Sequence, residues 1–190
     1  MTSQIICTVC AVARVITKIE TKDCVLGVTS VDDELFVLLV RDDDQVAVYS
    51  INDYQLLRHL NVPGFKPYNN FDITSCIRHK CLYMSDWHSK CIHRYDLASS
   101  ATSKWSVPGK PCGLSVTLSG NLLVTCSEPN KLVELSADSG QCVREITLRA
   151  NRWHNVQLTT GQFVVSHGGL SSDSHRVCVV DDDGLSLIHI

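Results

Sequence analysis

The sequence predicts an all-β protein, a β-propeller built of four-stranded antiparallel blades. The main observation is a recurring alternating strand segment that ends in an aromatic or aliphatic residue followed by a polar corner. Tyr49, Tyr95, Leu135 and Val180 occupy the matching position, at spacings of 46, 40 and 45 residues. In addition, no segment of about ten or more residues has apolar side chains at the 3.6-residue spacing of an amphipathic helix. A repeat of about 40–45 residues with four short strands is typical of a propeller blade.

Four strands are expected in each repeat, in chain order. First strands are expected at 25–31, 71–77, 112–118 and 155–160, each leading into a turn. Second strands are expected at 34–40, 81–86, 121–127 and 162–167, and third strands at 45–53, 91–99, 131–139 and 177–184. Fourth strands are expected at 56–64, 103–109 and 143–148, and an apolar strand segment, 184–190, ends the chain.

The apolar pattern of these strands agrees with blades that are covered on both faces. A four-stranded blade has two apolar faces, and it buries them by stacking against a neighbouring blade on each side. Strands such as 36–40 and 122–124 are accordingly apolar at consecutive positions rather than only at alternate ones.

We expect one propeller over residues 1–190, with blades at about 24–69, 70–111, 112–153 and 154–190. Segment 13–19 is expected to be a strand of a preceding blade. Four blades do not make a six-bladed ring, and an open stack exposes apolar faces and strand edges. We therefore favour a fragment of a six-bladed ring; a closed four-bladed ring and a pair of complementary chains are the alternatives.

Composition bears on the partners and the cellular compartment of the protein. The net charge is −3, with 17 Lys and Arg against 20 Asp and Glu, and no basic stripe that would favour nucleic acid is present. No apolar run reaches the length of about 18 residues that a membrane-spanning helix needs. Ten scattered cysteines favour a reducing compartment and thus the cytoplasm. The alternative is secretion, if residues 1–13, which end in Ala11-Val12-Ala13, are a signal peptide.

Two segments resemble NHL repeats. In "SHRVCVVDDDG" the matching positions are His175, Arg176, Val177, Val179 and Asp181. Residues 110–140 resemble the preceding part of the repeat, with a Pro-x-Gly strand, a Ser-Gly-Asn turn and a second strand.

The resemblance covers about 24–184 and departs from the family pattern at several places. The Asp that usually ends the second strand is present as Asp86 but is replaced by Cys126 in another blade, and Ser174 stands where Asn is usual. The resemblance implies a six-bladed propeller of the kind that ends TRIM-NHL proteins, which are ubiquitin-ligase and RNA-regulating scaffolds. The RING, B-box and coiled coil of those proteins have no counterpart here, so no ligase activity is expected from this chain alone.

Antiparallel strand order places the loops between second and third strands on the same rim as the loops between blades. Binding residues concentrate in loops on a rigid scaffold, and loop aromatics are typical interface anchors. The alternative for these aromatic residues is packing between blades. The candidate binding residues on this rim are Arg41, Phe65, Tyr68, Trp87, His88, Asn130, Lys131, Trp153 and His154.

No metal site, cofactor or catalytic set is expected. Cys7 and Cys10 form a lone CxxC that faces opposite sides of a strand. Four other possible ligands, Cys81, His88, Cys91 and His93, lie close in sequence, but all four are not expected to converge on one point. The acidic runs 42–44 and 181–183 lack the alternate-position spacing of calcium loops.

The leading hypothesis is therefore a non-catalytic interaction scaffold that binds a protein partner through its loop rim. One alternative is a metal-dependent hydrolase similar to SMP-30 and gluconolactonase, for which Asn70, Asp72 and His154 are the candidate residues. A second alternative is an RNA-binding propeller of the TRIM-NHL type, which the charge does not favour. No membrane partner is expected, and open blade edges provide a route to self-association.

Overall fold

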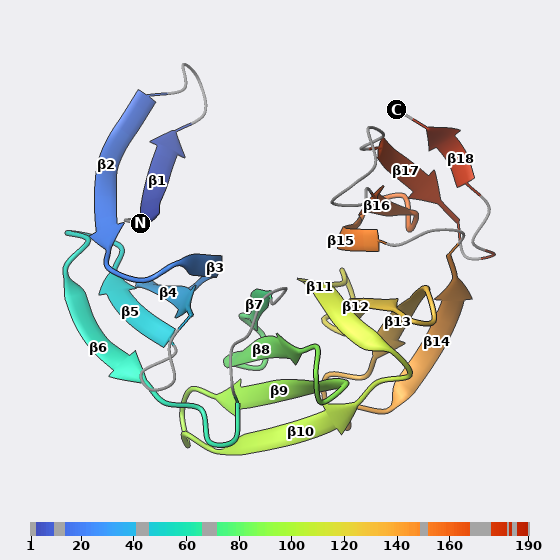
Figure 1. The fold of residues 1–190 in the computed structure, drawn as a ribbon, viewed down its shortest axis with the longest axis horizontal. Coiled ribbons are helices and arrows are strands. Elements are labelled where there is room, and N and C mark those ends of the chain that lie inside the picture. Colours follow the sequence, from blue (N-terminus) through green and yellow to red (C-terminus); the bar gives the residue numbers. More distant parts are fainter. Residues whose placement is uncertain are drawn as a thin grey trace. The chain divides into compact units, whose positions relative to one another are not determined.

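The structure is a computed structural model that describes residues 3–9, 14–40, 46–65, 72–148, 152–167, 176–181, 183 and 186–189. Among these residues every regular element is a β-strand (Figure 1). The chain divides into two compact units, unit 1 (Met1–Asn69) and unit 2 (Asn70–Ile190). Among the described residues, no helix has the length and apolar character needed to cross a membrane.

In unit 1 the part of the chain that the structure describes forms a two-stranded sheet and one four-stranded blade. The two-stranded sheet pairs β1 (Ser3–Val9) with β2 (Arg14–Thr21), so the segment expected at 13–19 is a strand. Blade 1 consists of β3 (Val25–Val31), β4 (Glu34–Leu39), β5 (Val46–Ser50) and β6 (Leu56–Leu60). Ile19 of β2 packs with Val37, Leu39, Ala47 and Tyr49, which lie on one face of blade 1.

The described residues of unit 2 form three four-stranded blades. Blade 2 consists of β7 (Ile73–Cys76), β8 (Cys81–Asp86), β9 (Cys91–Asp96) and β10 (Thr102–Ser106). Blade 3 consists of β11 (Lys110–Val116), β12 (Leu122–Ser127), β13 (Lys131–Leu135) and β14 (Cys142–Thr147). Blade 4 consists of β15 (Arg152–Gln157), β16 (Phe163–His167), β17 (Arg176–Val180) and β18 (Ser186–His189).

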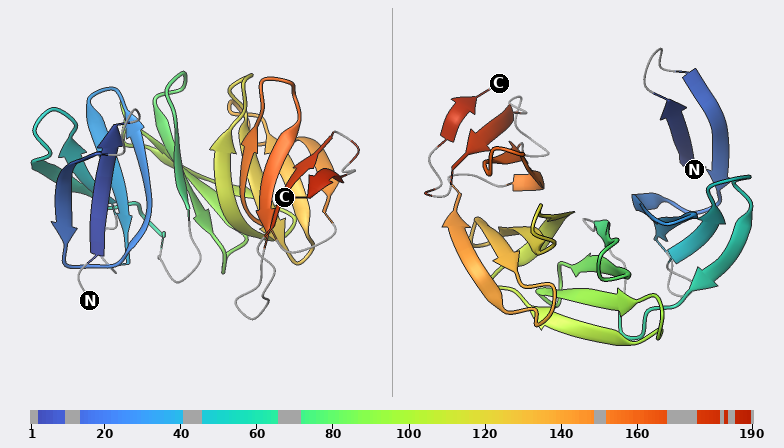
Figure 2. Two further views of the ribbon diagram at one scale, coloured as in Figure 1. Left: turned by 90° about the horizontal axis from the view of Figure 1, so that it is seen from above. Right: turned by 180° about the vertical axis from the view of Figure 1, so that it is seen from behind.

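Each four-stranded sheet is antiparallel, and its strands pair in chain order. The strands of a blade lie side by side, and in blades 2 and 3 short described turns join them at both ends (Figure 2). This is the meander of a propeller blade. The predicted all-β architecture of four-stranded antiparallel blades is therefore confirmed.

The first strands of blades 3 and 4 begin earlier than the sequence suggested, at Lys110 and Arg152 rather than at 112 and 155. Both strands carry a register irregularity near this end, between Pro111 and Leu114 and between Arg152 and Asn155. A bulge of this kind interrupts the alternation on which the prediction depended. As a result, the blade boundaries placed after 111 and after 153 fall inside β11 and β15.

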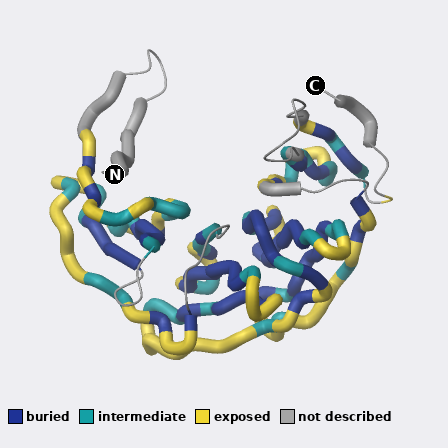
Figure 3. The backbone as a smooth tube through the Cα atoms, in the orientation of Figure 1, coloured by how far each residue is buried: buried dark blue, intermediate teal, exposed yellow. Residues whose placement is uncertain are grey.

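Blade 3 buries both of its faces within unit 2. Leu122 belongs to a core with Tyr83 and Ile92 of blade 2, whereas the adjacent Leu123 belongs to a core with Phe163 and Cys178 of blade 4. Side chains alternate between the two faces of a strand, so consecutive apolar residues serve two different cores. Outer strands such as β10 and β14 are mostly exposed, and the strands within the blades are mostly buried (Figure 3).

Candidate functional site

Antiparallel pairing gathers one set of strand ends of unit 2 on the same edge. We call this edge the Trp87 rim and define it as residues 86–90, 107–110, 128–131 and 152–154. The opposite edge, the Ile77 rim, contains the turns 77–80, 117–121 and 158–162. The predicted candidates Trp87, His88, Asn130, Lys131, Trp153 and His154 all belong to the Trp87 rim.

A cluster around Trp87 joins blade 2 to blade 3. The ammonium group of Lys110, which begins β11, lies 4.1 Å from the centroid of the Trp87 ring. The ring of His88 meets Trp87 edge to face, with centroids 5.0 Å apart. Lys110 also forms an ion pair with Glu128 in the β12–β13 turn. Trp87 is half-buried and His88 is exposed, so the cluster combines a fixed indole with an accessible imidazole.

The side chain of Lys131 and the backbone of Asn130 have partners within blade 3. Lys131 forms an ion pair with Glu145 of β14. The backbone carbonyl of Asn130 accepts a hydrogen bond of 3.0 Å from the Leu148 amide. These contacts fix the turn beside Glu128. The main role of Asn130 and Lys131 is therefore to hold the shape of the rim.

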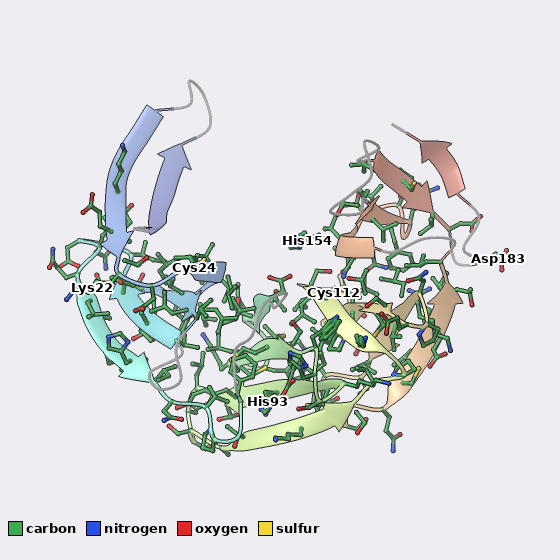
Figure 4. The ribbon with its side chains drawn as sticks, in the orientation of Figure 1. Lys22, Cys24, His93, Cys112, His154 and Asp183 are labelled. Atoms are coloured by element: carbon green, nitrogen blue, oxygen red, sulfur yellow. The ribbon has the colours of Figure 1, made fainter. Side chains whose placement is uncertain are left out.

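Asp72 and His154 bring together the first strands of three blades. The Nδ1 atom of His154 lies 3.5 Å from Oδ2 of Asp72, which directly precedes β7. The same carboxylate oxygen accepts a hydrogen bond of 2.9 Å from the Leu114 amide of β11. His154 lies on β15 and Cys112 on β11, and these two first strands are in contact (Figure 4). Asp72 is largely buried, and the His154 side chain is 72% exposed.

A buried amide fixes β15 against β11 next to this pair. Asn155 donates from Nδ2 to the Gly113 carbonyl at 2.9 Å, and its Oδ1 accepts a hydrogen bond from the Ser115 hydroxyl. The Gly113 amide in turn donates to the Thr125 hydroxyl at 2.9 Å. Because buried polar groups are costly when unpaired, this network favours a single register between the two strands.

The hydrogen bond to Asp72 raises the pKa of His154, and partial burial opposes it. A raised folded-state pKa means that the interaction stabilises the fold below the unfolded-state pKa of histidine. That stabilisation is lost as the pH rises through the higher folded-state pKa.

We therefore expect Asp72→Asn to lower the pKa of His154, measured by NMR titration of its ring protons. Asp138→Asn is the matched control, because Asp138 lies 3.7 Å from His79 on the opposite rim. An unchanged His154 titration in Asp72→Asn would contradict the pairing, and so would an equal shift in both variants.

A second group of possible metal ligands lies at the end of the β8–β9 hairpin. Asp86, Cys91 and His93 are buried, and one ligand atom from each lies within 4.8 Å of the others. Cys91 and His93 belong to the set of four considered from the sequence, which also contained Cys81 and His88. Cys81 instead points into the core between blades 2 and 3, and His88 is exposed in the turn. Asp86 was not among the ligands expected from the sequence, although its pairing with Cys91 across a four-residue turn places it beside them.

The remaining candidates lie elsewhere. Phe65 of unit 1 is 1% exposed, so its side chain is not presented to a partner. Trp153 lies on β15, and only its backbone is described. Arg41, Tyr68, Asn70 and Cys10 lie outside the described residues, as do Asp42, Asp43 and Asp44. Asp183 is exposed, and its amide donates to the Asp181 carboxylate at 3.1 Å.

No known protein family matches the sequence, and no curated protein matches it. Solved structures do match. A hydrazine synthase from Kuenenia stuttgartiensis aligns over 87% of this chain and 48% of its own, with a TM-score of 0.70 and 16% identity.

Two further solved structures show the same fold at low identity. A catalytically inactive histidine-to-alanine variant of virginiamycin B lyase from Staphylococcus aureus, solved with quinupristin, aligns over 98% of this chain and 59% of its own; its TM-score is 0.67 and its identity 10%. A protein of unknown function from Bacteroides caccae aligns over 98% of this chain and 68% of its own, with a TM-score of 0.67 and 11% identity. This chain therefore spans about half to two thirds of these structures, and the shared feature is the β-propeller fold.

Proposed function

We propose that the chain is a non-catalytic interaction module that binds a protein partner through the Trp87 rim. The observation that carries the proposal is the cluster of Trp87, His88 and Lys110. The indole is held in place by a cation above its ring and by an edge contact, and it is still partly exposed. An aromatic side chain fixed before binding loses little conformational entropy when a partner covers it, which is typical of an interface hot spot.

The charge distribution favours protein over RNA as the partner. Lys110 and Lys131 on the rim are each paired with a carboxylate, Glu128 and Glu145 respectively. Asp72 and Asp86 add negative charge at the same edge. RNA binding draws much of its affinity from unpaired basic groups that displace counterions from phosphates. A rim on which Lys110 and Lys131 are paired with carboxylates is better suited to a polar protein surface than to RNA.

The proposal includes an NHL-type propeller acting as a scaffold in the cytoplasm. The NHL-like segments at 110–140 and 174–184 support the assignment to an NHL-type propeller. The cytoplasmic location is supported by Cys76, Cys81 and Cys126, which lie among apolar core residues. Thiols used as small hydrophobic side chains persist in reducing compartments. Self-association through blade edges is the corresponding proposal for assembly.

The experiment compares proteins retained from a lysate by the immobilised chain and by two variants. Trp87→Ala removes the indole, and Ile77→Ala removes an exposed apolar side chain, 64% exposed, on the opposite rim. We expect at least one protein to be retained by the wild type and by Ile77→Ala but lost from Trp87→Ala. With that protein purified, Trp87→Ala should weaken its affinity by about 30-fold or more, as at other aromatic hot spots. Equal retention by all three forms would contradict the proposal.

A second candidate function is a metal-dependent hydrolase or lyase centred on Asp72 and His154. The observation that favours it is the approach of these side chains to 3.5 Å at the ends of first strands. An imidazole beside a carboxylate can serve as a general base or a metal ligand. Turnover of lactone or cyclic ester substrates that requires a divalent cation, and that His154→Ala abolishes, would establish this activity. Turnover that survives His154→Ala would exclude this pair as its centre.

A further inference from the structure

We propose that Asp86, Cys91 and His93 form a zinc site at the end of the β8–β9 hairpin. The cross-strand register pairs Asp86 with Cys91 and Met84 with His93. Paired residues in an antiparallel ladder point to the same face of the sheet. One hairpin therefore projects a carboxylate, a thiol and an imidazole from a single face, and all three side chains are buried.

The contact between Asp86 and His93 is a long hydrogen bond, and its length also matches the spacing of two ligands around one zinc ion. Oδ2 of Asp86 lies 3.4 Å from Nε2 of His93. A charge-assisted hydrogen bond between such groups is normally about 2.7–2.9 Å long. Two ligands of a tetrahedral zinc ion, each bound at about 2.0–2.1 Å, lie roughly 3.3–3.4 Å apart. The thiol sulfur of Cys91 completes the triangle within 4.8 Å.

The carboxylate is already oriented for this role. Its Oδ1 atom accepts a hydrogen bond of 2.9 Å from the Ser89 amide in the turn, which leaves Oδ2 directed at His93. Hydrogen bonds of this kind to metal ligands hold them in the binding geometry. The turn 87–90 thus positions the Asp86 carboxylate, and the same turn contains Trp87 and His88.

The ligand set and its charge indicate the kind of ion. Thiolate and imidazole select zinc over magnesium or calcium, which prefer oxygen ligands. Binding releases the Cys91 thiol proton to solvent, and the neutral imidazole binds through Nε2. A carboxylate and a thiolate then balance the two positive charges of the ion, so no net charge is left buried. Three protein ligands leave the fourth position of the tetrahedron for water.

The test uses the metal ion alone and the full chain, and it does not depend on the proposed partner. Protein freed of metal by a chelator is titrated with Co²⁺ and then with Zn²⁺. We expect one equivalent of Co²⁺ to bind with the visible bands of tetrahedral cobalt and a thiolate-to-cobalt charge-transfer band, and Zn²⁺ to displace it. Absence of Co²⁺ uptake by the wild type would overturn the proposal.

Variants identify the ligands. Cys91→Ser should abolish the charge-transfer band, and His93→Gln should weaken Co²⁺ binding by more than about 100-fold, above the usual effect of changing a group that only supports a ligand. Cys81→Ser is the matched control, because Cys81 is also buried in the same hairpin but faces the core shared with blade 3. A band that persists in Cys91→Ser would contradict the site.

A measurement on the wild type tests the site even if the variants fail to fold. X-ray absorption of the zinc-loaded protein should show one sulfur ligand at about 2.3 Å, with nitrogen and oxygen ligands at about 2.0–2.2 Å. A spectrum with two or more sulfur ligands, or with none, would assign the zinc to other residues and overturn the proposal.

Discussion

Gly140→Ala is expected to lower the free energy of unfolding of unit 2 by about 2–5 kcal/mol. Gly140 has a φ of +69°, and an alanine Cβ built there would lie 2.3 Å from the Trp105 ring. The left-handed conformation costs an L-residue about 1–2 kcal/mol, and forcing a methyl group against a packed side chain costs about 1–3 kcal/mol more. Chemical denaturation followed by tryptophan fluorescence measures the loss.

Gly161→Ala is the matched control for this substitution. Gly161 also has a positive φ, +89°, but no atom lies within 4 Å of the added Cβ. Only the conformational cost of about 1–2 kcal/mol should therefore appear. An equal loss in the two variants would mean that Trp105 of β10 does not cover the β13–β14 turn. That result would contradict the packing of blade 2 against blade 3.

Leu122→Ala and Leu123→Ala are each expected to destabilise unit 2 by about 2–5 kcal/mol, the usual range for truncating a buried leucine. Both side chains are almost fully buried, but they face different blades. The physical reason is the same for both, since each truncation removes apolar contacts and leaves a cavity. Denaturant unfolding measures both variants on the same scale.

Leu118→Ala provides the control, because Leu118 lies in the β11–β12 turn and is 67% exposed. This variant should lower the free energy of unfolding by no more than about 0.5 kcal/mol. A large effect from only one of the two buried leucines would show that blade 3 packs on one face alone. It would thereby contradict the stacking of three blades in unit 2.

The strand pattern was predictable because it depends on local sequence. The strands Val25–Val31 and Cys81–Asp86 lie where alternation and turn residues placed them. The starts of β11 and β15 were not predictable in this way, because a bulge changes the side-chain alternation without a distinct sequence signal.

The candidate site was predictable only in part. Loop position directed attention to Trp87, and the hydrolase alternative already grouped Asp72 with His154. The contact of Lys110 with Trp87 and the 3.5 Å approach of His154 to Asp72 become visible only when strands from different blades are placed together. Asp86 was noted as the end of a strand, but its proximity to His93 depends on the hairpin register rather than on spacing along the chain.

The most direct test of the central claim is amide hydrogen exchange of the chain, free and bound to a partner captured as described above. If the Trp87 rim is the binding surface, partner-dependent protection should appear in segments 86–90, 128–131 and 152–154. The turns 77–80 and 117–121 of the opposite rim should exchange at the same rate in both states. Protection confined to the Ile77 rim, with none around Trp87, would contradict the proposed function.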